Sequence, residues 1–242
     1  MPVIAFSTRF NLQPDPMTII FFDIDGTLVS MRGAGRAAFQ TCIRKVFGWE
    51  DDISYIQFAG ATDLDVVHQV CDHHNHAPTE EEFGRFFEHL PNVLQEKLPG
   101  FEPHIHAGGP ELLQELTARD QATIGLITGN EEQCAKLKLG HCDLAHYFSL
   151  GAFGHERRHR RDIASLALDR ALARLNLTRA GISALYLIGD TPSDIDAAKS
   201  IGATSIAVTS DNHGPEALFE ANADHVIDSL YAVEPILNFP RA

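Results

Sequence analysis

Residues 18–28 of the chain read Thr-Ile-Ile-Phe-Phe-Asp-Ile-Asp-Gly-Thr-Leu. The first five residues, 18–22, form a continuous β-branched and aromatic run, which is typical of a strand buried on both faces of a parallel sheet. Asp23 and Asp25 follow the run directly, and Gly26 permits a tight turn after them. The stretch therefore predicts a buried strand with two carboxylates at its carboxyl end.

Three later segments repeat this pattern of an apolar run that ends in polar residues. They are 122–127, which ends at Thr128-Gly129, 184–188, which ends at Gly189-Asp190, and 204–208, which ends at Thr209-Ser210. Helical patterns lie around them, over residues 110–119, 162–175 and 193–201. Strands that alternate with helices predict an α/β fold with a doubly wound parallel sheet.

Residues 31–103 interrupt this alternation. They contain no convincing strand, but three helical patterns, over residues 35–47, 63–73 and 80–98. We therefore expect an all-helical insert that returns to the sheet through a hinge at Pro99-Gly100.

The expected organisation has three parts. It consists of a core of residues 18–30 and 104–242, a helical cap of residues 31–103, and a loose N-terminal tail of residues 1–17 that contains Pro14 and Pro16. Met17 could be an alternative start of the chain. The residues before it contain neither a long apolar stretch nor a small-residue cleavage site, so we expect no signal peptide.

Composition limits the classes of partner. The 242 residues contain 19 Lys and Arg against 33 Asp and Glu, a net charge of −14. A field of this sign repels phosphate backbones and anionic lipids, so we expect neither nucleic acid nor membrane as a partner. The same field opposes a small anionic substrate unless local positive charge overrides it. The four Cys show no CxxC spacing, which favours reduced thiols and a cytoplasmic location.

The polar residues at the strand ends suggest one shared site. In an open parallel sheet, ligands bind at the carboxyl ends of the strands, so these polar residues should meet there. Several carboxylates in one crevice repel each other strongly, and a hard cation resolves that repulsion. Oxygen ligands favour Mg²⁺. The residues are Asp23, Asp25, Thr128, Asn130, Asp190 and Asp194.

These motifs resemble those of the haloacid dehalogenase superfamily. Asp23-Ile24-Asp25-Gly26-Thr27 is similar to its DxDGT signature, and Gly189-Asp190-Thr191-Pro192-Ser193-Asp194 is similar to its GDxxxD motif. A strand that ends in Thr128 and a basic stretch at residues 157–161 lie between them in the family's order. Phosphoglycolate-phosphatase-like members carry a helical cap where residues 31–103 are inserted. The resemblance implies a Rossmann-like core with such a cap.

The resemblance also implies roles for single residues. Asp23 would be the nucleophile that forms an aspartyl-phosphate, and Asp25 would be the general acid and base, as its position two residues further along the strand allows. Thr128 would donate its hydroxyl to the phosphate. The implied Mg²⁺ ligands are Asp23, the backbone carbonyl of Asp25, Asp190 and Asp194, although Asp194 could instead only cap a helix. The residues expected to contact substrate are Gly26, Thr27, Gly129, Asn130 and Arg36.

The third motif departs from the family. The family supplies a Lys to neutralise the phosphate, whereas residues 154–161 read Gly-His-Glu-Arg-Arg-His-Arg-Arg and contain none. Arg160 is the first candidate for this role, because Arg can also bind a phosphate in a bidentate manner. Arg158 is the second. Lys138 is the third and weakest candidate, because it lies about ten residues, or about 15 Å, along the helix that follows Thr128.

Asp25 argues against a dehalogenase, because displacement of halide needs no general acid. The motifs predict a Mg²⁺-dependent phosphatase that hydrolyses a small phosphorylated metabolite, as a monomer or small homo-oligomer. A phosphomutase would share every core residue, and a phospho-acceptor switch remains a third, weaker alternative. Related enzymes often carry a basic residue beside the glycine of the cap turn, but Ala61 stands next to Gly60 here.

Histidine is abundant, with 13 residues in the chain. Three groups could bind a transition metal or could lie in solvated loops, and the second reading is favoured because no paired Cys or HExxH helix accompanies them. They are His73, His74 and His76; His104 and His106; and His155 and His159.

Overall fold

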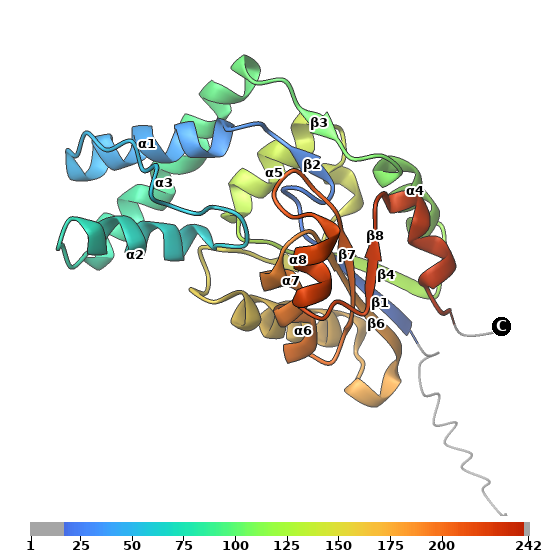
Figure 1. Cartoon of the computed structure of the whole chain (residues 1–242). Helices are drawn as coiled ribbons and strands as arrows, with labels where there is room; N and C mark the ends of the chain where they lie inside the picture. The colour runs from blue at the N-terminus through green and yellow to red at the C-terminus, as the bar shows by residue number, and fades with distance from the viewer. Residues whose placement is uncertain (1–16, 240–242) are drawn as a thin grey trace, which may run out of the picture.

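The computed structural model describes residues 17–239 (Figure 1). Most of the expected N-terminal tail, residues 1–16, lies outside the described residues, whereas Met17 already belongs to the first strand. Within residues 17–239, no helix is long and apolar enough to cross a membrane.

A six-stranded parallel sheet forms the centre of the molecule, in the order β5-β4-β1-β6-β7-β8. The chain starts in the middle of the sheet, moves outward in one direction and then crosses β1 to continue in the other. This doubly wound order confirms the predicted fold class. The strands are β1 (Met17–Phe22), β4 (Ala122–Ile127), β5 (Gly151–Ala152), β6 (Ile182–Gly189), β7 (Thr204–Val208) and β8 (His225–Ile227). The sequence did not reveal β5 and β8, because each has only two or three residues.

The alternation of side chains along β1 builds a core on each face of the sheet. Ile19 and Phe21 belong to one apolar cluster, and Ile20 and Phe22 belong to the other. All four are fully buried. This explains why the run from 18 to 22 carries no polar alternation.

Helices cover both faces of the sheet (Figure 1). α6 (Arg160–Leu175) and α7 (Pro192–Ser200) pack on the cluster of Ile19 and Phe21, while α4 (Gly109–Thr117) and α5 (Glu132–His141) pack on the other. The short α8 (Pro215–Glu220) packs beside β7 and β8. The bounds of α4, α6 and α7 agree with the sequence expectations within two residues.

Residues 31–103 form three helices that lie to one side of the sheet (Figure 1). They are α1 (Ala34–Phe47), α2 (Asp63–His73) and α3 (Glu80–Lys97). The chain leaves and re-enters the sheet through two strands that pair with each other in antiparallel fashion, β2 (Val29–Ser30) and β3 (His104–Ile105). This pairing holds the two connections to the helical segment side by side.

Candidate active site

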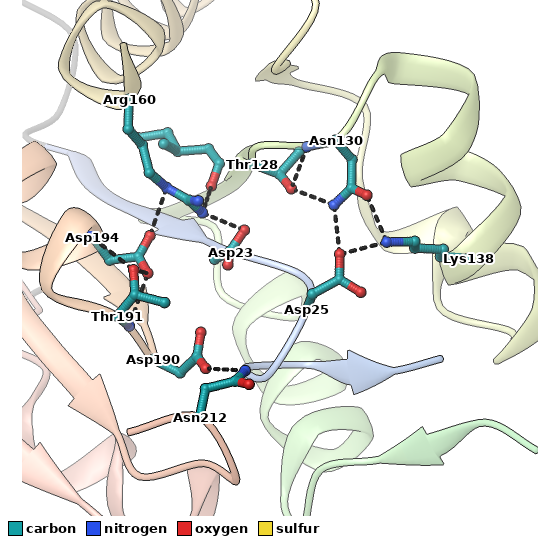
Figure 2. A network of polar contacts seen from close by, with 11 residues as sticks. Asp23, Asp25, Thr128, Asn130, Lys138, Arg160, Asp190, Thr191, Asp194 and Asn212 are labelled. Atoms are coloured by element: carbon teal, nitrogen blue, oxygen red, sulfur yellow. Dashed lines mark hydrogen bonds and ion pairs between the residues drawn. The ribbon is translucent and has the colours of Figure 1, made fainter. Parts of the chain in front are cut away.

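The order of the strands brings the expected polar residues together. β1 lies between β4 and β6, so the residues that follow these three strands share one edge of the sheet. Figure 2 shows Asp23 and Asp25 after β1, Thr128 and Asn130 after β4, and Asp190 after β6. The convergence expected at the carboxyl ends of the strands is therefore present.

Arg160, at the start of α6, links two of the carboxylates (Figure 2). Its Nη2 lies 2.5 Å from Asp23 Oδ1, and its Nε lies 2.8 Å from Asp194 Oδ1. All three side chains are buried. The helix begins at Arg160 rather than at residue 162 as expected, so Arg160 is its first residue.

The three carboxylates nearest Arg160 carry more negative charge than Arg160 can offset. Burial raises the pKa of Asp23 to about 7, although Arg160 opposes this increase. Burial also raises the pKa of Asp190 to about 6 and raises that of Asp194. Oxygen atoms of Asp23, Asp190 and Asp194 lie within 4.8 Å of one another. Such a cluster is stable in its charged form only with a further cation.

The donor set fits Mg²⁺. Carboxylate oxygens are hard ligands of the kind that this ion prefers. Asp190 Oδ1 is buried and has no hydrogen-bond partner among residues 17–239, as expected of an atom reserved for a ligand. Asp194 differs, because Arg160 contacts its Oδ1 and the Thr191 amide and hydroxyl donate to its Oδ2 at 3.1 and 2.7 Å. Asp194 therefore orients Arg160 and also caps α7.

Two residues after β7 hold the Asp190 carboxylate, and no role was assigned to either of them from the sequence. Ser210 Oγ donates to Asp190 Oδ2 at 2.7 Å, and Asn212 Nδ2 lies 3.5 Å from the same oxygen. Gly26 makes room on the other side, since a Cβ there would lie 2.1 Å from Asp190 Oδ2. Ser210 could have been found from the sequence, because Thr209-Ser210 follows the predicted strand of residues 204–208.

Asp25 is held by a second polar network (Figure 2). Lys138 Nζ and Asn130 Nδ2 both donate to Asp25 Oδ2, at 2.6 and 2.8 Å. Lys138 also donates to Asn130 Oδ1 at 2.6 Å, and Asn130 donates to Thr128 Oγ1 at 2.8 Å. Burial alone would lower the pKa of Lys138, but the Asp25 carboxylate raises it, so the lysine stays charged.

Lys138 was ranked third because about 15 Å of helix separates it from Thr128, yet its Nζ lies 2.6 Å from Asp25 Oδ2. That ranking measured distance along a helix axis, whereas α5 runs beside Asp25 and the long lysine side chain reaches across to it. Arg158, in contrast, is exposed, and its Nε donates to Asp65 Oδ1 at 2.7 Å on α2. Arg160 and Lys138 thus contact the two carboxylates after β1, and Arg158 contacts neither.

The N-terminus of α2 is joined to the sheet edge through backbone contacts. Asp63 N donates to Gly129 O at 2.7 Å, and Asp63 Oδ2 accepts from Glu131 N at 2.6 Å. The Thr62 hydroxyl donates to Arg158 O at 2.8 Å. A Cβ on Gly129 would lie 2.1 Å from Ala61 O, so this position requires glycine for the close approach.

A cavity of about 310 Å³ lies between the sheet edge and the helical segment. Asp23, Asp25 and Arg160 line one end of it, together with Gly129, Asn130 and Lys138.

Arg36, which was expected to contact substrate, also lines the cavity. Its guanidinium donates to Ile53 O and Ile56 O at 2.6 and 3.1 Å and lies over the Phe58 ring. Thr27 is fully buried and does not line the cavity.

The stability of the protein should depend on the ionisation of Asp63. Burial raises the pKa of Asp63 from 3.8 to about 7, so the native state binds more protons than the unfolded state between these values. The free energy of unfolding should therefore fall as pH rises through this window. Asp63→Asn keeps an acceptor for the Glu131 amide and removes the charge. Between pH 4.5 and pH 8, we expect the free energy of unfolding of this variant to fall by about 2–4 kcal/mol less than that of the wild type.

Urea unfolding at several pH values measures this difference. Asp72→Asn, an exposed substitution on the same helix, is the control and should follow the wild-type curve. If the curves of Asp63→Asn and the wild type run parallel, Asp63 does not contribute to the pH dependence.

The three histidine groups do not form a metal centre together. His74 stacks on Trp49 and lies 2.9 Å from Asp51 Oδ2, while His73 stacks on Tyr55. In the part of the chain that the structure describes, Asp23, Asp190 and Asp194 are the only group of three or more His, Cys, Asp or Glu placed to hold a metal ion. All four cysteines are free thiols.

Residues 20–208 match the family described as "Haloacid dehalogenase-like hydrolase". No curated protein matches this sequence. Among solved structures, a "predicted phosphatase" from Clostridium acetobutylicum is 21% identical, with a TM-score of 0.65 over 92% of this chain and 98% of that one. A "predicted phosphoglycolate phosphatase" from Haemophilus somnus is 19% identical, with a TM-score of 0.66 over 91% and 97%. CbbY from Rhodobacter sphaeroides, solved with phosphate, is 17% identical, with a TM-score of 0.67 over 90% and 96%.

Proposed function

Because the chain belongs to the haloacid dehalogenase-like hydrolases, we propose that it is a Mg²⁺-dependent phosphatase that hydrolyses a small phosphorylated metabolite. The observation that carries this proposal is the pairing of Asp23 with Arg160 at the cavity that Asp25 also lines. A carboxylate beside a guanidinium is suited to attack phosphorus while the cation neutralises the transferring group.

Asp23 is the proposed nucleophile. Its Oδ1 is held by Arg160, which fixes the direction of the carboxylate toward the cavity. Attack of a carboxylate oxygen on phosphorus forms an aspartyl-phosphate and breaks the bond to the leaving oxygen. The Thr128 hydroxyl is proposed to donate a hydrogen bond to a phosphoryl oxygen. The Gly26 and Thr27 amides, which were also expected to contact substrate, instead donate to Val29 O and Ile24 O at 2.9 and 3.3 Å.

Asp25 is the proposed general acid and base. In the first step it gives a proton to the leaving oxygen, and in the second it accepts a proton from the water that hydrolyses the aspartyl-phosphate. Lys138 and Asn130 hold one of its oxygens, so the carboxyl keeps a fixed position in the cavity. Its side chain is 42% exposed, against 5% for Asp23, as a group that exchanges protons with solvent requires.

Asp23 and Asp190 would hold Mg²⁺, together with the backbone carbonyl of Asp25 and, through intervening waters, Asp194. When bound, the ion would offset the carboxylate charge and that of the phosphoryl group. We also propose that residues 31–103 act as a cap over the core of residues 18–30 and 104–242. The contacts of Asp63 and Thr62 with the sheet edge support this division, because they close the cavity from the cap side.

Release of inorganic phosphate from a panel of phosphate monoesters tests the proposed function. We expect turnover in Mg²⁺ that stops with excess EDTA and returns when Mg²⁺ is restored. Conversion of a sugar 1-phosphate to its isomer without release of phosphate would indicate a phosphomutase instead. A chain that retains radiolabelled phosphate without turnover would indicate a phospho-acceptor switch.

Lys138→Met should lower kcat/KM by about 10- to 100-fold, which corresponds to the loss of a hydrogen bond between charged groups. The substitution leaves Asp25 with Asn130 as its remaining partner at Oδ2. Lys136→Met is the matched control, since Lys136 is exposed and pairs with Glu132 one turn away. Equal rates for the two variants would show that Lys138 does not contribute to the reaction.

A further inference from the structure

The cavity extends from the catalytic carboxylates into the helical cap, and its two ends differ in chemistry. We propose that the leaving group of the substrate is an apolar group, such as an aliphatic or aromatic ring, rather than a polyhydroxylated sugar. This inference rests on the proposed phosphatase function and adds the class of substrate to it.

Apolar side chains form the cap side of the cavity. They come from the connection before α1, from α1 itself, from the loop before α2 and from the second half of α3, so four separate segments contribute to one wall. The wall consists of Met31, Ala38, Phe39, Phe58, Leu90 and Leu94. With a volume of about 310 Å³, the cavity accommodates a small ligand and few waters beside it.

Two of the three charged side chains on the cap side already have partners within the protein. Arg36 donates to two backbone carbonyls of the cap and lies 4.5 Å over the Phe58 ring. Asp63 accepts from the Glu131 amide. Arg32 lines the cavity but is exposed to solvent. Apart from Ser30, Arg32, Arg36 and Asp63, the polar side chains that line the cavity lie at the other end, around Asp23 and Asp25.

This distribution separates substrates by the polarity of the leaving group. The phosphoryl group meets Arg160 and the polar network, whereas the leaving group meets the apolar wall. Sugar hydroxyls at this wall would lose hydrogen bonds to water without new partners, while an apolar ring would gain from burial. A single added hydroxyl in an apolar pocket changes kcat/KM by about 100-fold, so a ring with several should be rejected at least as strongly.

Two esters of similar shape test the inference. Cyclohexylmethyl phosphate and glucose 6-phosphate each carry a six-membered ring joined to phosphate through one methylene group, and they differ in the polarity of the ring. With the full chain in Mg²⁺, we expect kcat/KM to be at least 100-fold higher for cyclohexylmethyl phosphate. Equal or higher kcat/KM for glucose 6-phosphate would overturn the inference and leave the phosphatase function intact. Hydrolysis of neither ester by a chain that releases phosphate from p-nitrophenyl phosphate would also overturn the inference alone. No release of phosphate from any of the three esters would overturn the proposed function, and the inference with it.

Substitution of Phe58 tests whether the wall causes the preference. Phe58→Gln places an amide at the wall and should reduce the ratio of the two kcat/KM values by about tenfold, whereas Phe58→Leu keeps the wall apolar and should preserve the ratio. Thermal unfolding establishes that both variants are folded. An unchanged ratio in a folded Phe58→Gln variant would show that this wall does not select the leaving group.

Discussion

Asp23→Asn is expected to lower the turnover of phosphate monoesters by about 10⁴-fold or more. An amide oxygen is a poor nucleophile, so the aspartyl-phosphate cannot form, and the steps that follow it are lost as well. The substitution preserves the shape of the side chain and removes one of three clustered carboxylates, so it should not unfold the protein. Initial rates of phosphate release with p-nitrophenyl phosphate measure the effect.

Asp169→Asn is the matched control, because Asp169 is exposed on α6 and the same substitution there should leave the rate unchanged. Mass spectrometry of the wild type during turnover should detect a chain that is heavier by one phosphoryl group, and Asp23→Asn should lack it. An active Asp23→Asn variant would mean that another group attacks phosphorus.

The sequence predicted the convergence of Asp23, Thr128 and Asp190, because it depends on a general property of parallel sheets. Each residue follows a strand, and the carboxyl ends of neighbouring strands meet at one edge. A continuous apolar run of five residues left little freedom in the position of β1. Strand ends could therefore be located within one or two residues.

Contacts that depend on how helices pack could not be predicted in this way. Lys138 reaches Asp25 because α5 lies beside the turn after β1, and no local pattern specifies that neighbourhood. The close approach of Ala61 to Gly129 is similar, since it depends on where the cap meets the sheet. Glycine is common after a strand. Nothing in the sequence shows that Gly129, in particular, is contacted by the loop that contains Ala61.

Arg160→Met should lower the free energy of unfolding by about 3–5 kcal/mol in the absence of Mg²⁺, which is the usual cost of removing one partner of a buried ion pair. Arg160 contacts Asp23 and Asp194 inside the protein, where water cannot replace it. Without the guanidinium, the negative charges of three carboxylates stay close together with no positive partner. Arg161→Met is the control, because Arg161 is exposed and pairs with Asp196 at the surface. Urea unfolding in EDTA should show a much smaller change for this variant.

The response to Mg²⁺ then separates the two roles of Arg160. If the metal binds the same carboxylates, its binding free energy adds to stability, and it should stabilise Arg160→Met at least as much as the wild type. Phosphate release should nevertheless stay at least 100-fold below the wild-type rate, since Mg²⁺ restores charge balance among the carboxylates but leaves the phosphoryl group without its guanidinium. Arg160→Lys keeps the charge, but a single ammonium group lacks the two separate donors that reach Asp23 and Asp194, so its rate should be intermediate. Full activity of Arg160→Met in Mg²⁺ would show that Arg160 only stabilises the fold, and the neutralising role would then fall to Lys138.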